Sequence, residues 1–72
     1  MKVKINLDTM SKINRFVSIC TCIDCSIDLI DGSGYKVNAK SLIGAIAATD
    51  WSQIFVVSEK DIYSHIQEFV ED

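Results

Sequence analysis

The run Gln53-Ile54-Phe55-Val56-Val57 limits most strongly what this chain can fold into. Its four apolar residues are all β-branched or aromatic, which favours an extended strand. Because no polar residue interrupts them, both faces of this strand are expected to be covered, as is typical of a strand inside a sheet. The rest of the chain must therefore supply strands on either side of residues 53–57.

Three other segments have strand character. Residues 2–7 alternate polar and apolar side chains, so the apolar ones share one face of a half-buried strand. Residues 26–30 and 35–38 predict two further strands. They are separated by Asp31-Gly32-Ser33-Gly34, a turn whose two glycines can adopt positive φ. The two segments are therefore expected to form a hairpin.

Helical spacing predicts three helices. The first, over residues 11–21, has apolar side chains at i, i+3, i+4 and i+7, namely Ile13, Phe16, Val17 and Cys20. A short second helix over residues 41–48 begins with Ser41 as its N-cap. Ser58 is the expected cap of a third helix that reaches nearly to residue 72, with Asp61 approximating a capping box. Its apolar stripe is Ile62, Tyr63, Ile66, Phe69 and Val70.

The predicted element order is β-α-β-β-α-β-α within a single domain, residues 1–72. This order is typical of an α+β two-layer sandwich with helices on one face of an antiparallel sheet. A ferredoxin-like domain with an added C-terminal helix has the same order, so the order alone leaves both folds open.

Composition excludes several classes of protein. Of the 72 residues 49% are hydrophobic and 24% are charged, which suits a packed domain rather than a disordered chain. The net charge is −3 with scattered Lys and Arg, so we expect no nucleic-acid partner. The apolar segments are too short to span a bilayer, and the N-terminus lacks the apolar region of a signal peptide. We therefore expect a cytoplasmic protein without membrane insertion.

The three cysteines, Cys20, Cys22 and Cys25, lie close together in the sequence. An odd number at such short spacing does not suit a disulfide framework and fits a reducing compartment. Zinc usually takes four ligands, and the only histidine, His65, is distant in sequence, so no metal site is predicted. Cys20 is expected to be a small core residue instead.

No arrangement of residues predicts catalysis or a cofactor. The acidic side chains are expected to be mostly solvated charges, and none pair at helical spacing around an apolar pocket: Asp28, Asp31, Glu59, Asp61, Glu68, Glu71 and Asp72. The glycines do not form a phosphate loop. His65 is at the border of the third helical stripe, where a structural or solvent-exposed role is expected.

The segment before the second helix has a particular electrostatic setting. Ser41 precedes the first turn, where backbone N–H groups are unpaired and the helix dipole places partial positive charge. A phosphate on the Ser41 hydroxyl would be stabilised there.

Val37-Asn38-Ala39-Lys40-Ser41-Leu42-Ile43-Gly44 resembles the regulatory-serine segment of the HPr phosphocarriers, the small phosphotransfer proteins of the bacterial sugar phosphotransferase system. The resemblance implies an open-faced sandwich with sheet order 1-4-2-3. It also implies that a dedicated kinase phosphorylates the serine that matches Ser41. The aliphatic residues after that serine would form a docking patch for partner proteins.

The same resemblance fails at the carrier site. HPr carriers hold the phosphoryl group on a histidine at the start of the first helix, in a His-Ala-Arg-Pro motif. The matching residues here are Ile13-Asn14-Arg15-Phe16, of which only Arg15 agrees. Isoleucine offers no nucleophile, so the protein is not expected to carry phosphate at this position or to be an enzyme.

These observations predict a non-catalytic, monomeric, protein-binding module regulated at Ser41. Three large aliphatic residues within five positions cannot all face the sheet, so at least one is expected to be exposed. The predicted partner contacts are Arg15, Phe16, Lys40, Leu42, Ile43 and Ile46. The implied partners are enzyme I, an HPr kinase or a transcriptional regulator of sugar use. Two alternatives stay open: a phosphocarrier with a non-standard site, for which His65 is the only candidate, and a small-molecule- or metal-binding regulatory domain.

Overall fold

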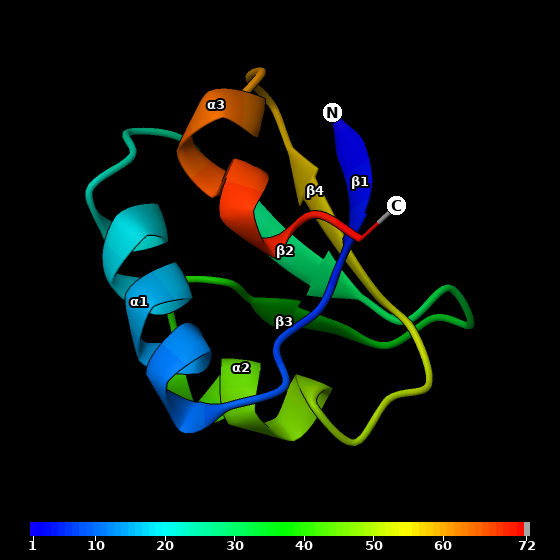
Figure 1. Ribbon diagram of the computed structural model, residues 1–72. Helices are drawn as coiled ribbons and strands as arrows, with labels where there is room; N and C mark the ends of the chain where they lie inside the picture. Colours follow the sequence, from blue (N-terminus) through cyan, green and yellow to red (C-terminus); the bar gives the residue numbers. More distant parts are fainter. Residues whose placement is uncertain (72) are drawn as a thin grey trace.

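The computed structural model describes residues 1–71 and confirms the predicted order of elements (Figure 1). The strands are β1 (Lys2–Ile5), β2 (Ile27–Ile30), β3 (Lys36–Asn38) and β4 (Ile54–Ser58). The helices are α1 (Met10–Thr21), α2 (Leu42–Ala48) and α3 (Tyr63–Ile66), and α3 continues into the 3-10 turn η1 (Gln67–Phe69). Asp72, predicted to be a solvated charge, lies outside the described residues.

The four strands form one antiparallel sheet in the order β1-β4-β2-β3. Strand β4 therefore lies inside the sheet, as its uninterrupted apolar run predicts. Val56 of β4 is opposite Val3 of β1 on one side and Leu29 of β2 on the other. The α+β sandwich and the strand order 1-4-2-3 are thus both confirmed.

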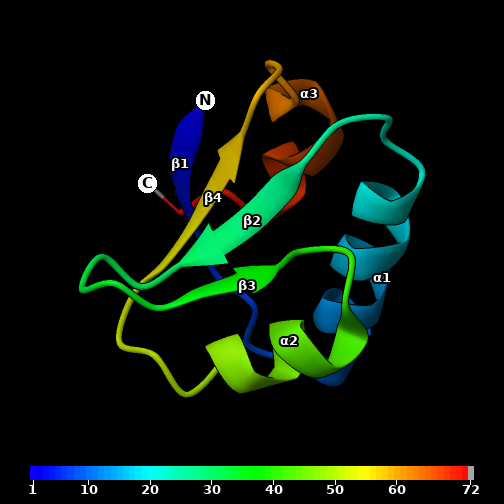
Figure 2. The ribbon, with the colours of Figure 1, turned by 180° about the vertical axis from the view of Figure 1, so that it is seen from behind.

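The helices cover only one face of the sheet. In Figure 2 no helix crosses in front of the strands, and α3 lies behind β4 and β2. Val56 and Ile54 point to the covered face and are buried, whereas Phe55 and Val57 point to the open face and are half-buried. The prediction that both faces of β4 are covered is therefore wrong, because an antiparallel sheet with its helices on one side leaves the other face to solvent.

The core lies between the sheet and the helices. Helix α1 contributes Ile13, Phe16 and Cys20, so the predicted core position of Cys20 is confirmed. The Phe16 ring contacts the Phe69 ring of η1 edge to face, with 5.3 Å between centroids. This geometry is favourable for aromatic pairs and ties α1 to the C-terminal part of the chain.

The third helix begins later than predicted. Ser58 is the last residue of β4 rather than a helix cap: its N–H donates to the Met1 carbonyl at 2.9 Å, and it pairs with Ile27 of β2. Helix α3 starts at Tyr63, and its N-cap residue is Ile62, which makes no side-chain cap hydrogen bond; the Tyr63 N–H donates to the Asp61 carboxylate at 3.1 Å. The predicted stripe is buried at Ile62, Ile66 and Phe69, but the Tyr63 side chain is exposed. Pairing within the sheet extends β4 through Ser58 and overrides the local capping pattern.

The residues after η1 return to the sheet. Asn6 donates its N–H to the Phe69 carbonyl, and Glu71 donates its N–H to the Lys4 carbonyl, both at 2.9 Å. Val70 forms a bridge with Ile5 of β1. Residues 69–71 therefore cover part of the outer edge of β1.

The predicted hairpin turn is organised by Asp31. Its carboxylate accepts the N–H of Ser33 at 2.8 Å and that of Tyr35 at 3.2 Å. These hydrogen bonds, the Ser33 N–H first among them, hold the pKa of the Asp31 carboxyl below its ordinary value. Gly32 and Gly34 have φ of 89° and 125°, as the turn prediction requires. Asp31 is thus a structural acceptor as well as a surface charge.

Candidate functional site

Ser41 is the N-cap of α2, as predicted. Its backbone is extended, and its Oγ accepts the Gly44 N–H at 3.2 Å while its carbonyl accepts the Ala45 N–H at 2.9 Å. Just before it, the Asn38 side-chain oxygen accepts the Lys40 N–H at 2.8 Å. Local hydrogen bonds of this kind turn the chain from β3 into the helix. The Ser41 side chain is half-buried.

Helix α2 packs on the rest of the molecule through its smallest side chains. Ala45 and Ala48 are fully buried. A Cβ at Gly44 would lie 3.2 Å from the Val37 Cβ and 3.4 Å from the Asn38 carbonyl oxygen, so the helix backbone lies very close to β3. At that separation no large side chain fits between α2 and the sheet.

The three large residues of α2 consequently face solvent. Leu42, Ile43 and Ile46 are 41%, 81% and 40% exposed. They occupy positions i, i+1 and i+4 and form one continuous apolar surface, which we call the α2 patch. The sequence predicted at least one exposed aliphatic residue here, and all three are exposed. None of the residues of α2 is charged.

Lys40, predicted as a partner contact, has a structural contact of its own. Its half-buried ammonium group donates to the Ile23 carbonyl at 2.8 Å, which joins the loop after α1 to the approach to α2. Its positive charge also acts on the Cys20 thiol. Burial raises the pKa of that thiol to about 12, an effect that the positive charge of Lys40 partly offsets. Cys20 is therefore a protonated core residue at neutral pH.

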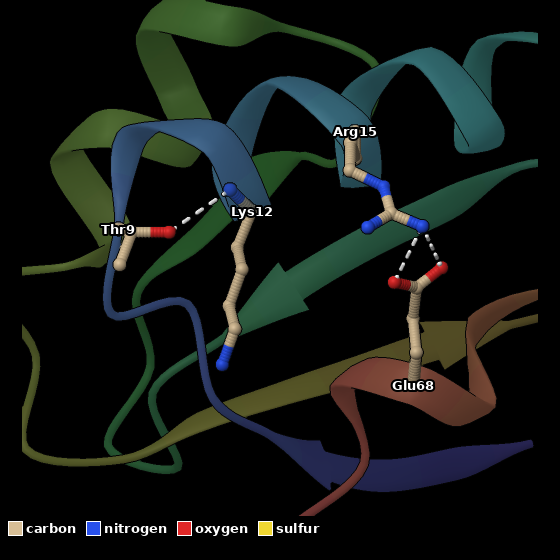
Figure 3. A network of polar contacts seen from close by, with 4 residues as sticks. All are labelled: Thr9, Lys12, Arg15 and Glu68. Atoms are coloured by element: carbon tan, nitrogen blue, oxygen red, sulfur yellow. Dashed lines mark hydrogen bonds and ion pairs between the residues drawn. The ribbon is translucent and has the colours of Figure 1, made fainter.

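Arg15 does not join the α2 patch. Figure 3 shows its guanidinium pointing from α1 toward η1, where Nη2 contacts the two carboxylate oxygens of Glu68 at 2.8 and 2.9 Å. The Arg15 side chain is 62% exposed. The cation predicted to contact a partner anion is thus already paired within the chain.

Phe16 corrects another prediction. It is fully buried and packs against Phe69, so it cannot contact a partner at the surface. The helical stripe already placed Phe16 on the apolar face of α1, and that pattern was the better guide.

The start of α1 also differs from the alignment with the carrier motif. Thr9 is the N-cap, with its Oγ1 accepting the Lys12 N–H at 3.1 Å (Figure 3). Ile13 lies one turn further on and is 4% exposed. The residue at the helix start is therefore Thr9, whereas Ile13 belongs to the core.

One exposed residue of this end of the molecule was missed. Met10, the first residue of α1, is 53% exposed although it continues the apolar spacing of that helix. The N-terminal end of α1 lies beside α2 in both views of the fold (Figures 1 and 2). No sequence pattern distinguishes Met10 from the buried residues that follow it.

Other candidate groups lie apart from this surface. His65 is exposed in α3, in agreement with one of the two roles expected for it. The three cysteines are free thiols, with Cys22 exposed and Cys25 half-buried. Within residues 1–71, no three His, Cys, Asp or Glu side chains come together in a way that could hold a metal ion. Over the same residues, no helix has both the length and the apolarity needed to cross a membrane.

Comparisons with family models, with curated proteins and with solved structures found no match to this chain.

Proposed function

We propose that this chain is a divergent, non-catalytic HPr-like module that binds a protein partner through the α2 patch and is regulated by phosphorylation of Ser41. The resemblance of residues 37–44 and the sheet order 1-4-2-3 support the family assignment. The observation that carries the functional part is the orientation of α2. Its alanines are buried, and its three large aliphatic residues face solvent.

The α2 patch has the chemistry of a docking surface. Contiguous exposed aliphatic side chains bordered by polar residues favour association with an apolar surface of another protein. Ile43, at 81% exposed, projects furthest into solvent and is the natural residue to enter a pocket on the partner. Met10 is a further exposed apolar residue, at the end of α1 that lies beside α2.

In this proposal Ser41 controls the α2 patch. It directly precedes Leu42, and phosphorylation would add about two negative charges next to the patch. A phosphate oxygen can accept the Gly44 N–H in place of the hydroxyl, so the cap is retained. The modification would then oppose burial of the neighbouring aliphatic side chains, because the charge must also be desolvated. Regulation would change the surface while the fold stays the same.

The non-catalytic assignment rests on α1. Thr9 stands at the helix start, and Ile13 is in the core, so neither position offers an imidazole. The partners that fit the proposal are enzyme I, an HPr kinase or a transcriptional regulator of sugar use. We place the module in the cytoplasm as a monomer, where these partners act.

The regulatory part is tested by incubating labelled protein with an HPr kinase and ATP. We expect one phosphate on Ser41, with amide NMR shifts confined to the cap and α2. The Ser41→Ala variant should show neither the mass change nor the shifts. An unmodified Ser41 under conditions in which the kinase modifies an HPr carrier would overturn this part.

The docking part is tested by titrating enzyme I, the kinase without ATP and a regulator into separate samples. We expect one of them to shift the amides of the α2 patch, and Ile43→Ser should weaken that binding at least tenfold, as for a central contact residue. Tyr63→Ser is the matched control, because Tyr63 is an exposed large side chain on α3. Equal losses in both variants, or no shift with any partner, would contradict the proposal.

The alternative that the protein is a phosphocarrier is tested in a separate sample. Enzyme I with phosphoenolpyruvate should leave the protein without an acid-labile label. A label that disappears in His65→Gln would favour a phosphocarrier with a non-standard site instead.

A further inference from the structure

The open face of the sheet has a charge pattern unlike the rest of the chain. Directly opposed residues place Lys4, Phe55, Ile30 and Lys36 in one row across all four strands on this face. An apolar pair in the middle is thus flanked by a lysine at each edge of the sheet. The whole chain has a net charge of −3, whereas this row carries two lysines and no carboxylate.

Part of this face is hollowed. Next to the hairpin turn, a hollow of about 400 Å³ is lined by Lys2, Ile30, Gly32, Gly34, Tyr35 and Lys36. This volume lies within the range of small-ligand sites, which is about 300–1,000 Å³. Ile30 is half-buried and provides an apolar wall, and the Tyr35 ring is 69% exposed. The glycines have no side chains to fill the space.

Two ammonium groups are available at this hollow. Lys4 is near Glu71, at 3.9 Å, but neither Lys2 nor Lys36 forms an ion pair with a carboxylate of residues 1–71. The Lys2 Nζ lies 5.0 Å from the centroid of the Phe55 ring, a contact that restrains its position at the sheet surface.

The carboxylates nearby do not line the hollow. Asp31 accepts hydrogen bonds from the turn, and Asp28 lies on the same open face one outward-facing position before Ile30, in the row of Lys2 and Val57. Neither is among the residues that line the hollow.

We propose that this hollow binds a small aromatic anion, with its phosphate or carboxylate between Lys2 and Lys36 and its ring against Tyr35 and Ile30. Unpaired lysines supply the charge complementarity, and an exposed tyrosine ring supplies a stacking surface. The site is on the face opposite the helices, so a ligand there leaves the α2 patch free.

Phenyl phosphate is the probe, titrated into labelled protein and followed by amide NMR. We expect saturable shifts at residues 2, 30, 35 and 36. Inorganic phosphate and phenol, which each supply only half of the chemistry, should bind at least tenfold more weakly. Equal binding of inorganic phosphate would overturn the assignment, because the ring would then contribute nothing.

Charge variants test the role of the two lysines. K2Q/K36Q should bind phenyl phosphate roughly tenfold more weakly, whereas K2R/K36R should retain binding. K12Q is the control, because Lys12 is on α1 and paired with Asp8 at 3.0 Å. Absence of saturable shifts, equal binding by K2Q/K36Q and the unaltered protein, or tighter binding of a short single-stranded DNA than of phenyl phosphate would each overturn the proposal.

Discussion

Both carboxylate oxygens of Glu68 lie within 2.9 Å of one guanidinium nitrogen of Arg15. The contact joins α1 to η1 across 53 positions of sequence. It has two consequences. Nη2 of Arg15 is occupied inside the chain, so a partner anion would have to use the remaining guanidinium N–H groups beside the Glu68 carboxylate. The pair is also exposed, so it contributes little to stability.

Removing this pair should cost little. In a double-mutant cycle of Arg15→Gln and Glu68→Gln, we expect a coupling free energy of about 0.2–1 kcal/mol that decreases with added salt, because both side chains are solvated. Urea unfolding of the four proteins at low and high ionic strength measures it. The Lys12 and Asp8 pair provides a helical comparison. A coupling free energy above about 2 kcal/mol would contradict this prediction and show that the Arg15–Glu68 pair contributes strongly to tertiary stability.

The cap of α2 should be measurable in the free energy of unfolding. Ser41→Ala removes the acceptor of the Gly44 N–H and should destabilise the protein by about 1 kcal/mol. Ser41→Asp should be close to the unaltered protein, because Asp is also a good N-cap and its charge suits the helix start. Equilibrium urea unfolding compares them. Equal stability of Ser41→Ala and the unaltered protein would mean that the 3.2 Å contact contributes nothing.

Substitutions on the two sides of α2 should differ in how much stability they cost. Ala45→Val inserts two methyl groups where α2 packs against the sheet and should cost about 1–3 kcal/mol. Ile43→Ser changes a solvent-facing side chain of similar helix propensity and should stay within about 0.5 kcal/mol. Thermal unfolding monitored by circular dichroism distinguishes them. A larger loss for Ile43→Ser would show that this side chain is packed in solution.

The thiols should differ in reactivity and in their effect on alkaline stability. Exposed Cys22 should react with a disulfide reagent at pH 8, whereas Cys20 should react only after unfolding. Burial raises the pKa of Cys20 from 9.0 to about 12. The contribution of the protonated Cys20 thiol to the free energy of unfolding is therefore fully present below pH 9 and is lost between pH 9 and 12. Cys20→Ala should show a shallower loss of stability over that interval. If Cys20→Ala and the unaltered protein lost stability equally steeply between pH 9 and 12, the buried position of Cys20 would be contradicted.

Asp31 should stabilise the folded protein at neutral pH but not in acid. Its pKa in the folded protein is held below the ordinary value of 3.8, so its stabilising effect is present above pH 3.8 and is lost as the pH falls through the folded-state pKa. Asp31→Ala should therefore be less stable than the unaltered protein at pH 7, with the difference shrinking in acid. Urea midpoints at several pH values test this. Asp50→Ala, which removes an exposed carboxylate, is the control variant, and a stability difference for Asp31→Ala that stays the same from pH 7 into acid would contradict this role of Asp31.

Most of the fold follows from local patterns. The alternating and uninterrupted apolar runs located all four strands, and the stripe of α1 located its buried face. What local patterns could not supply is the pairing between distant segments. Ser58 has the chemistry of a helix cap, but its backbone pairs with β2 and with Met1, and these tertiary contacts decided its structure.

The candidate site was predicted less completely for a related reason. Size and hydrophobicity suggest that Leu42 or Ile46 should anchor α2, yet the close approach at Gly44 leaves room only for alanine. The informative pattern was the spacing of the small residues, Gly44, Ala45 and Ala48. Likewise, the partner of Arg15 is distant in sequence, and only the fold brings Glu68 to it.

The short return of residues 69–71 along β1 affects how copies of this protein meet. A bare strand edge is a template for pairing with other chains and for aggregation. Here the carbonyl of Lys4 and the N–H of Asn6 already have partners, so the flank of β1 is partly closed. At the opposite flank β3 is only three residues long and ends in Lys36 and Asn38, a polar and charged border. The sheet can thus leave a whole face open to solvent while offering little length at either flank for growth into fibrils.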